Sequence, residues 1–373
     1  MKKNIISTAF IATALLMAAC MQEHDEGTQT SASLITFNVP STQWNQATTR
    51  AKVFSSINDL KASTTDIRVT AKYHSDHTVY FQNERLQFLN NTWTLSKKIN
   101  DTWVAANYYW IPNTPLDFFA DVVSGNGDRS AFDSQVSNKA EYTFDYTVPA
   151  AIANQHDYIY AVSLNQSRND AGVPLEFKHA LSQIVFTASV AENWNVTIEK
   201  ITIVNVRSAG TFSYETQAWS DLDDPDESYV FTLATPKVFN GMSAAERLLA
   251  ANDERLVLMP QTLNNPWVPK TTSGDRTPIT TANTQLQSYV IVSCKIQDRN
   301  DNNYYVGSSA TYGNVYAPLS GTWEPNKVYI YDLPFGAGYK ADGRKTIEQI
   351  TLSATIVDWT TGETVDDGIA RFD

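Results

Sequence analysis

The feature that most restricts the fold of this chain is a long succession of short strand-like runs separated by turn signals. In SLITFNV the apolar residues Ile35, Phe37 and Val39 alternate with polar ones, as they do on a strand with one buried face. β-branched and aromatic residues dominate later runs such as LSQIVFTASV, VTIEKITIVNV and KVYIYDLPF. Runs at this short spacing predict an all-β fold of sandwich type.

Turn signals mark the ends of these runs. The clearest are SGNGDRS, DDPDES, QDRNDNNY and DGR, and QDRNDNNY (297–304) joins two strand-like runs as the tip of a hairpin would. Helical signal is scarce. The best case is MSAAERLLAAND, in which Ser243 and Glu246 have the spacing of a capping box.

The amino-terminal residues have the features of a targeting sequence. Residues 1–19 combine Lys2 and Lys3 with a short apolar segment and two small residues, which is the layout of a secretory signal peptide. The sequence Met-Ala-Ala-Cys that ends at Cys20 resembles the lipobox of bacterial lipoproteins. That resemblance implies acylation of the Cys20 thiol and a lipid contact with the membrane. The alternative is a plain signal peptide with a chance cysteine.

Residues 20–33 are polar, without apolar periodicity, and predict an extended tether. The acidic residues Glu23, Asp25 and Glu26 resemble the signal that exports some lipoproteins to the outer face of the outer membrane. We therefore expect an outer-membrane lipoprotein at the cell surface. The alternative is a charge run that only improves solubility.

The charge of the chain limits its partners. The formal net charge is -12, and it becomes more negative once Lys2 and Lys3 are removed with the signal peptide. No basic cluster offsets it, so we expect no binding to nucleic acid. The second of the two cysteines, Cys294, lies in a strand-like run and is expected to be a buried small apolar residue.

Residue clusters that could carry chemistry are weak. His74 and His77 flank Asp76 in HSDH, and residues 220–228 hold five carboxylates, but neither has the pattern of a metal site, so we expect a surface turn and a solvated loop. There is no nucleophile elbow, zinc-protease motif or phosphate loop. The aromatic run NYYW is expected to pack in the core rather than to stack on sugars. We expect no cofactor, no metal and no enzymatic activity.

Several stretches together resemble the fimbrillin family, the Mfa-like type V pilins and adhesins. They are ITFNVP followed by TTRA, then YYWIPNTPLDFFA, LEFKHALSQIVFTA, LVLMPQTL, WEPNKVYIYDL and ITLSATIVDW. They occur in the order of the family and span nearly the whole chain after the signal peptide. FKHALSQIVF and the final VDW are the most specific.

The resemblance implies two transthyretin-like, Greek-key β-sandwich domains in tandem. The Gly- and Pro-bearing stretch NDAGVP places the boundary, which gives domains of 34–174 and 175–373. In the family, LEFKHALSQIVFTA begins the second domain. His179 within it is expected to be a packed, hydrogen-bonded core residue.

The resemblance also implies assembly by strand exchange. The strand Leu34–Val39 would fill its own groove, with Ile35, Phe37 and Val39 as plugs, until a protease cuts between Arg50 and Ala51. Residues 34–50 would then be a removable strand and loop, and a strand of a neighbouring subunit would replace them. The alternative for Arg50 is an ordinary surface arginine, because some members keep their lipid and stay as anchors.

The tail 360–373 is a candidate donor strand for the next subunit, with Val365, Ile369 and Phe372 as plugs; a frayed end is the alternative. The sequence thus predicts a fimbrial subunit or fimbria-associated adhesin whose partners are other pilin subunits and a host or bacterial surface ligand. It would lie in the fimbrium after processing. The alternative is a monomeric surface lipoprotein that binds a glycan or a host protein.

Overall fold

The computed structural model describes residues 33–40, 57–123, 136–137, 142–191, 194–248, 256–263, 287–335 and 353–358. Within them nearly every regular element is a β-strand, so the all-β prediction is confirmed. The helical segments among these residues are α1 (Ile57–Lys61) and the 3₁₀ turn η1 (Ile152–Asn154).

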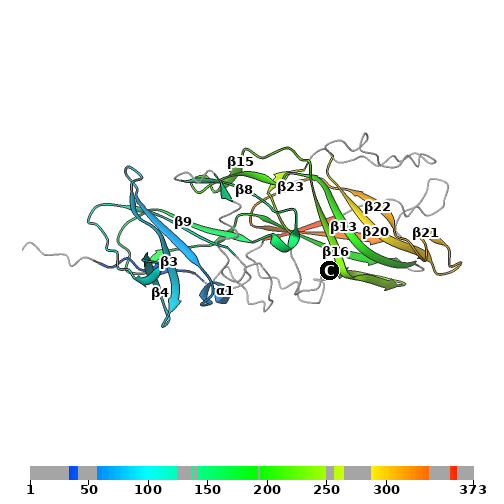
Figure 1. The fold of residues 1–373 in the computed structure, drawn as a ribbon, viewed down its shortest axis with the longest axis horizontal. Helices are drawn as coiled ribbons and strands as arrows, with labels where there is room; N and C mark the ends of the chain where they lie inside the picture. Colours follow the sequence, from blue (N-terminus) through cyan, green and yellow to red (C-terminus); the bar gives the residue numbers. More distant parts are fainter. Residues whose placement is uncertain are drawn as a thin grey trace, which may run out of the picture.

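The strands have the following bounds: β1 Phe37–Asn38, β2 Ile67–Tyr73, β3 Val79–Leu89, β4 Thr92–Ile99, β5 Thr102–Ala105, β6 Leu116–Val123, β7 Val136–Ser137, β8 Thr143–Thr147, β9 Tyr158–Gln166, β10 Val173–Pro174, β11 Lys178–His179, β12 Ser182–Val190, β13 Trp194–Val206, β14 Ala209–Ser213, β15 Ala218–Ser220, β16 Glu227–Asn240, β17 Ser243–Arg247, β18 Leu256–Leu258, β19 Gln261–Thr262, β20 Tyr289–Asp298, β21 Tyr304–Val306, β22 Gly313–Pro318, β23 Thr322–Trp323, β24 Lys327–Phe335 and β25 Ser353–Asp358. They form an elongated molecule, with α1, β3 and β4 towards one end and β13, β20 and β21 towards the other (Figure 1).

The amino-terminal part is built on a seven-stranded sheet of order β11-β9-β6-β2-β3-β4-β5. One face of this sheet packs on a hydrophobic cluster to which α1 contributes Ile57 and Leu60. The first strand, β1, and its partner β10 lie on the same cluster through Phe37 and Val173. We call this set of residues the first cluster.

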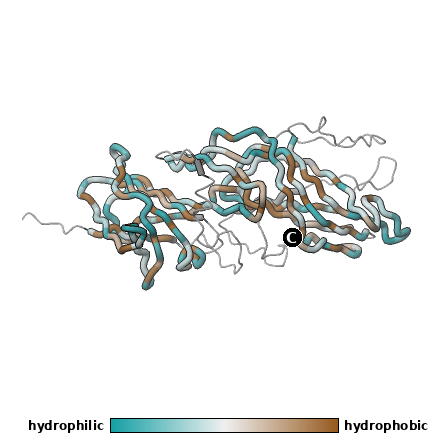
Figure 2. Tube along the Cα trace, viewed as in Figure 1, coloured by the Kyte–Doolittle hydropathy of each residue, from teal (hydrophilic) through white to brown (hydrophobic). Residues whose placement is uncertain are grey.

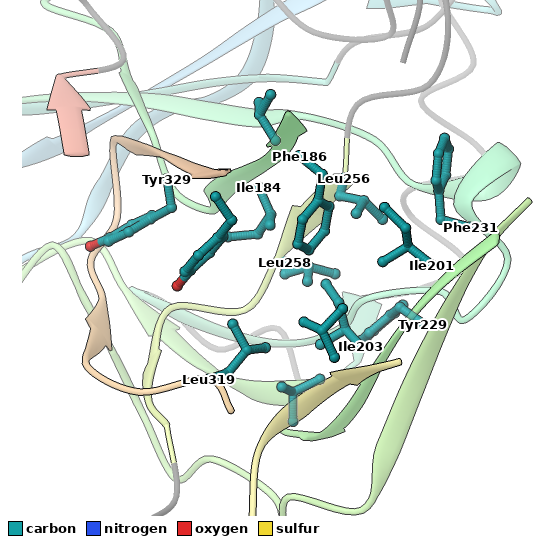
Figure 3. Packing of buried hydrophobic residues seen from close by; sticks show 14 of the residues in the cluster. Ile184, Phe186, Ile201, Ile203, Tyr229, Phe231, Leu256, Leu258, Leu319 and Tyr329 are labelled. Carbon is teal, nitrogen blue, oxygen red and sulfur yellow. The ribbon is translucent and has the colours of Figure 1, made fainter. Parts of the chain in front are cut away.

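The carboxy-terminal part contains a second, larger cluster between two sheets. One sheet has the order β17-β12-β24-β25, with β18 beside β12, and the other has the order β16-β13-β20-β21, with β22 beside β20. Figure 3 shows Ile184 and Phe186 of β12 opposite Ile201 and Ile203 of β13, with Leu258 from β18 among them. This face-to-face packing is that of a β-sandwich.

Strands β6 and β9 separate the two clusters. Alternate residues of a strand point to opposite faces of its sheet. In β9, Ile159 belongs to the first cluster and Tyr160 to the second, and in β6 the same holds for Phe118 and Phe119. The two cores therefore share one sheet rather than being joined by a bare linker.

A four-stranded sheet of order β15-β14-β8-β7 closes the second cluster near this shared sheet. Strand β8 precedes residue 174 in the chain, whereas its partner β14 follows it. The division into two transthyretin-like domains at residue 174 stays a prediction.

Tight hairpins connect neighbouring strands, as the turn signals indicate. Asn90 and Asn91 between β3 and β4 both have positive φ, and so do Asn100 and Asp101 between β4 and β5, as type I′ turns require. The hairpin expected at 297–304 is also present, between β20 and β21. Its tip is hydrophilic in colour at the far end of the molecule in Figure 2.

The prediction of a helix in MSAAERLLAAND (242–253) was wrong for residues 242–248; residues 249–253 lie outside the described residues. Residues Ser243–Arg247 form β17, which pairs antiparallel with β12. The Ser243 hydroxyl does donate to the Glu246 carboxylate, at 2.7 Å, but Glu246 also lies 2.7 Å from the Lys237 ammonium on β16. Pairing with β12 therefore outweighs the local capping signal.

Cys294 is fully buried on β20, as expected, and burial raises the pKa of its thiol to about 12. Because the thiolate is the reactive form, we expect a thiol-reactive dye to leave the folded protein unlabelled and to label it once urea unfolds it. The measurement uses a chain without residues 1–20, in which Cys294 is the remaining cysteine. Prompt labelling of the folded protein would contradict the buried placement.

Candidate functional site

The first described segment, residues 33–40, forms the candidate site. Its side chains alternate strictly: Ile35, Phe37 and Val39 are 5 %, 7 % and 7 % exposed, whereas Leu34 is 42 % exposed. The three buried side chains all belong to the first cluster. The alternation read from the sequence is therefore present, and the segment uses one face as an apolar anchor.

Backbone hydrogen bonds hold this segment on two sides. On one side the Ile35 amide donates to the Tyr108 carbonyl and the Trp110 amide donates to the Ser33 carbonyl, both at 2.8 Å. On the other side β1 pairs in parallel with β10. We call residues 33–39, together with 108–110 and 173–175, the first-strand site.

On the side where β1 pairs with β10, two further backbone hydrogen bonds of 2.8 Å hold the segment. The Val173 amide donates to the Thr36 carbonyl, and the Leu175 amide donates to the Asn38 carbonyl. Val173 and Leu175 are themselves fully buried in the first cluster. Removal of the first segment would leave these buried donors without their partners.

Aromatic side chains form the floor under Phe37. Its ring meets the Phe118 ring edge-on, with centroids 5.8 Å apart, and Trp110 meets the same Phe118 ring at 5.8 Å. Trp110 is 5 % exposed and Tyr109 is 44 % exposed, so alternate rings of the NYYW run point inward, as expected.

Tyr108 fixes the segment that receives Ile35. Its ring stacks on Phe81, with centroids 4.3 Å apart, and its hydroxyl donates to the Glu84 carboxylate at 2.8 Å. Burial and the bond to Glu84 raise the pKa of the Tyr108 hydroxyl, and burial raises the pKa of Glu84. The contacts of Tyr108 thus keep its backbone carbonyl in place for the Ile35 amide.

A glycine allows the close approach of β10. Gly172 has φ +84°, and a Cβ there would lie 3.0 Å from the Phe37 carbonyl carbon. The turn before it is closed by Asn169, whose side-chain oxygen accepts from the Ala171 amide at 2.9 Å. Only glycine fits both the positive φ and the contact with the first strand.

The sequence from residue 39 to residue 359 matches the family model described as fimbrillin-like. This chain belongs to the fimbrillin-like family. The match spans most of the chain, and it confirms the resemblance found in the sequence. Membership indicates a fimbrial or adhesive role at the cell surface.

Solved structures similar to this fimbrillin-like protein include two candidate cell adhesion proteins. The one from Bacteroides ovatus shares 14% identity, with a TM-score of 0.44, and the alignment covers 88% of this chain and 98% of that one. The one from Bacteroides uniformis shares 14% identity, with a TM-score of 0.41, covering 87% and 99%. The tip fimbrial protein Mfa3 of Porphyromonas gingivalis shares 14% identity, with a TM-score of 0.32, covering 83% and 97%. No curated protein matches the chain.

The other predicted site residues of the fimbrillin-like protein lie outside the described residues. They are Cys20, the cleavage pair Arg50 and Ala51, and the tail residues Val365, Ile369 and Phe372. Their roles stay predictions, and so does the role of Ile35, Phe37 and Val39 as a removable plug. Within the described residues no helix has the length and apolar character needed to cross a membrane.

The remaining clusters of the fimbrillin-like protein make local contacts. The rings of His74 and His77 lie at the turn between β2 and β3, with Nδ1 atoms 2.9 Å and 4.0 Å from the Asp117 carboxylate. In the acidic loop the Asp223 carboxylate accepts from the Ser208 amide at 2.9 Å. Across the described ranges no group of three or more metal-type ligands converges.

Sequence reasoning missed half of the first-strand site. Val173 was taken only as part of the domain boundary NDAGVP, although this stretch carried the signal of a tight glycine turn next to the site. Trp110 was assigned to the core without a link to the first strand. The partners of a strand lie far apart in the sequence, so the alternation of one strand cannot identify them.

Proposed function

We propose that this fimbrillin-like protein is a subunit of an adhesive surface fimbria that assembles by strand exchange. The first strand, with Ile35, Phe37 and Val39, occupies an acceptor groove until cleavage between Arg50 and Ala51 frees it. The observation that supports this is the first-strand site. A short segment at the start of the described chain is bonded on both sides and buries three alternate apolar side chains.

The physical basis of exchange is the cost of an empty groove. Loss of the strand exposes apolar surface of the first cluster. It also leaves the backbone amides of Trp110, Val173 and Leu175 without the carbonyls to which they donate. Each buried donor left without a partner costs about 1–3 kcal/mol. A strand from a neighbour that alternates apolar side chains in the same register supplies both the hydrogen bonds and the plugs.

The tail 360–373 is our candidate for that donor strand, with Val365, Ile369 and Phe372 as plugs. Before cleavage, the lipid on Cys20 and the tether 20–33 hold the subunit at the outer membrane. After cleavage the lipid leaves with the first strand, and the subunit passes into the fimbrium. The partners are then other subunits and a surface ligand, and no step requires catalysis.

Cleavage by an arginine-specific protease tests this proposal. We expect one early cut after Arg50, followed by loss of residues 34–50 and a ladder of oligomers on a native gel. The Arg50→Lys variant is the matched control: the arginine-specific protease should leave it monomeric, and trypsin should restore cutting and assembly. Fragments are identified by mass.

Two results would argue against assembly by exchange. The first is an Arg50 that resists the protease in the folded protein. The second is a clean cut after which the cleaved protein stays monomeric at high concentration and with added tail peptide 360–373. An uncut Arg50 would favour an anchor that keeps its lipid or a monomeric surface lipoprotein that binds a glycan or a host protein. A persistent monomer after the cut and the added peptide would favour the monomeric protein.

A further inference from the structure

A cleft of about 300 Å³ lies on the face of the seven-stranded sheet that turns away from the first cluster. Arg68, Thr70 and Lys72 of β2 point into it, and they alternate with residues of β2 that belong to the first cluster. Strands β3, β6 and β8 complete the lining, together with Tyr214 just after β14. The cleft is therefore separate from the first-strand site.

A β-bulge aims two amide side chains at this cleft. Val69 pairs with Glu84 and Ala71 pairs with Phe81, so Gln82 and Asn83 together stand opposite Thr70. Asn83 has φ 56°, and its backbone amide donates to the Thr70 hydroxyl at 3.1 Å. Both Gln82 and Asn83 are exposed and line the cleft. Bulges often re-aim side chains in this way near binding sites.

Each charged side chain of the cleft lining has a partner within the protein. The Arg68 guanidinium makes a two-pronged contact with the Asp66 carboxylate, at 2.6 and 2.7 Å. The Lys72 ammonium lies over the Tyr142 ring, 3.8 Å from its centroid, and the Asp121 carboxylate accepts from the Tyr214 hydroxyl at 3.0 Å. Because these charged groups are already paired, the lining favours a ligand without net charge.

We propose that this cleft binds one neutral sugar residue of a glycan. A sugar hydroxyl both donates and accepts, and the amides of Gln82 and Asn83 with the Thr70 and Thr143 hydroxyls offer both functions. Val79, 46 % exposed, adds apolar surface, and the volume is that of a small-ligand site. Among the described lining residues Asp121 is the one carboxylate, whereas glycoside hydrolysis uses two, so we assign the cleft to binding.

The inference rests on the adhesive part of the proposed function and is independent of strand exchange. The test therefore uses the uncleaved protein, and its failure leaves the cleavage experiment unaffected. Fluorescently labelled protein is applied to an array of immobilised oligosaccharides ending in glucose, galactose, mannose, N-acetylglucosamine, sialic acid or glucuronic acid. We expect binding to one or more of the neutral sugars, and the corresponding free monosaccharide should compete.

Two variants then locate the binding in the cleft. Gln82→Ala removes one amide, and Asn83→Gly removes the other while keeping a residue suited to positive φ. Each should weaken binding about tenfold, the equivalent of one or two lost hydrogen bonds. Gln87→Ala is the matched control, because Gln87 lies on the same strand but does not line the cleft.

Three results would overturn the proposal. They are an array without any neutral hit, binding restricted to the acidic sugars, and neutral binding that is equal in Gln82→Ala, Asn83→Gly and the wild type. Thermal unfolding of each variant verifies that the exposed substitutions leave the fold intact. A tenfold loss in both cleft variants, with wild-type binding in Gln87→Ala, supports the site.

Discussion

Replacement of Phe37 by alanine is expected to release the first strand from its site without unfolding the rest of the protein. Phe37 is 7 % exposed, and its ring packs on Phe118. Removal of a buried phenylalanine side chain costs about 3–5 kcal/mol. A loss of about 3 kcal/mol in the docking free energy of the strand shifts its docking equilibrium more than a hundredfold.

Hydrogen exchange measures this release directly. The amides of Trp110, Val173 and Leu175 donate to carbonyls of the first strand, so their exchange should accelerate in Phe37→Ala. Leu34→Ala is the matched control, because Leu34 lies in the same segment, 33–40, and is 42 % exposed. Unchanged exchange at those three amides in Phe37→Ala would mean that the strand stays docked without the Phe37 ring, which would contradict the role of Phe37 as a plug.

The result also bears on assembly. In the proposed mechanism the protease opens the loop after the first strand, and the strand must then leave its site. A protein with Phe37→Ala should therefore polymerise faster after the cut at Arg50, because strand departure precedes the entry of a donor. The Phe37→Ala substitution should leave the cleft lined by Gln82 and Asn83 unchanged, because that cleft lies on the opposite face of the seven-stranded sheet.

Local patterns in the sequence predicted those features that depend on neighbouring residues. The alternation of Ile35, Phe37 and Val39, the burial of Cys294 and the hairpin at 297–304 are all present. Each depends on a period of two residues or on a turn residue, and both are visible in a short window.

Features that depend on distant partners were not predictable in this way. The parallel pairing of β1 with β10 joins segments separated by most of the amino-terminal part. The capping pair of Ser243 and Glu246 indicated a helix, but pairing with β12 makes the segment a strand. The bulge at Asn83 carries no signal beyond one asparagine, because register against β2 creates it.

For His179 the sequence predicted burial in the core, but it did not identify the residues to which His179 is hydrogen-bonded. It is 1 % exposed, and its Nδ1 atom lies 2.9 and 3.0 Å from the two oxygens of Asp157, which is fully buried. Its backbone amide donates to the Asn326 side chain at 3.1 Å. Phe177 belongs to the first cluster and Ala180 to the second, so this contact lies where the chain passes between the cores.

Breaking the contact between His179 and Asp157 is expected to destabilise the protein strongly. Either single change, His179→Leu or Asp157→Leu, leaves a buried polar partner and should lower the free energy of unfolding by about 3 kcal/mol. The double variant removes both polar groups, so its loss should be well below the sum of the single losses. Urea unfolding of all four proteins gives the values.

A second His–Asp contact provides the control for burial. His74 also lies 2.9 Å from a carboxylate, that of Asp117, but its side chain is 44 % exposed. Because solvent replaces the lost contact and the Asn165 amide still donates to Asp117, His74→Leu should cost less than about 1 kcal/mol. Equal losses in His74→Leu and His179→Leu would show that burial does not set the strength of the contact. A much larger loss at His179 would show that the buried contact, at the junction between the two cores, contributes more to stability than the exposed contact of the same length.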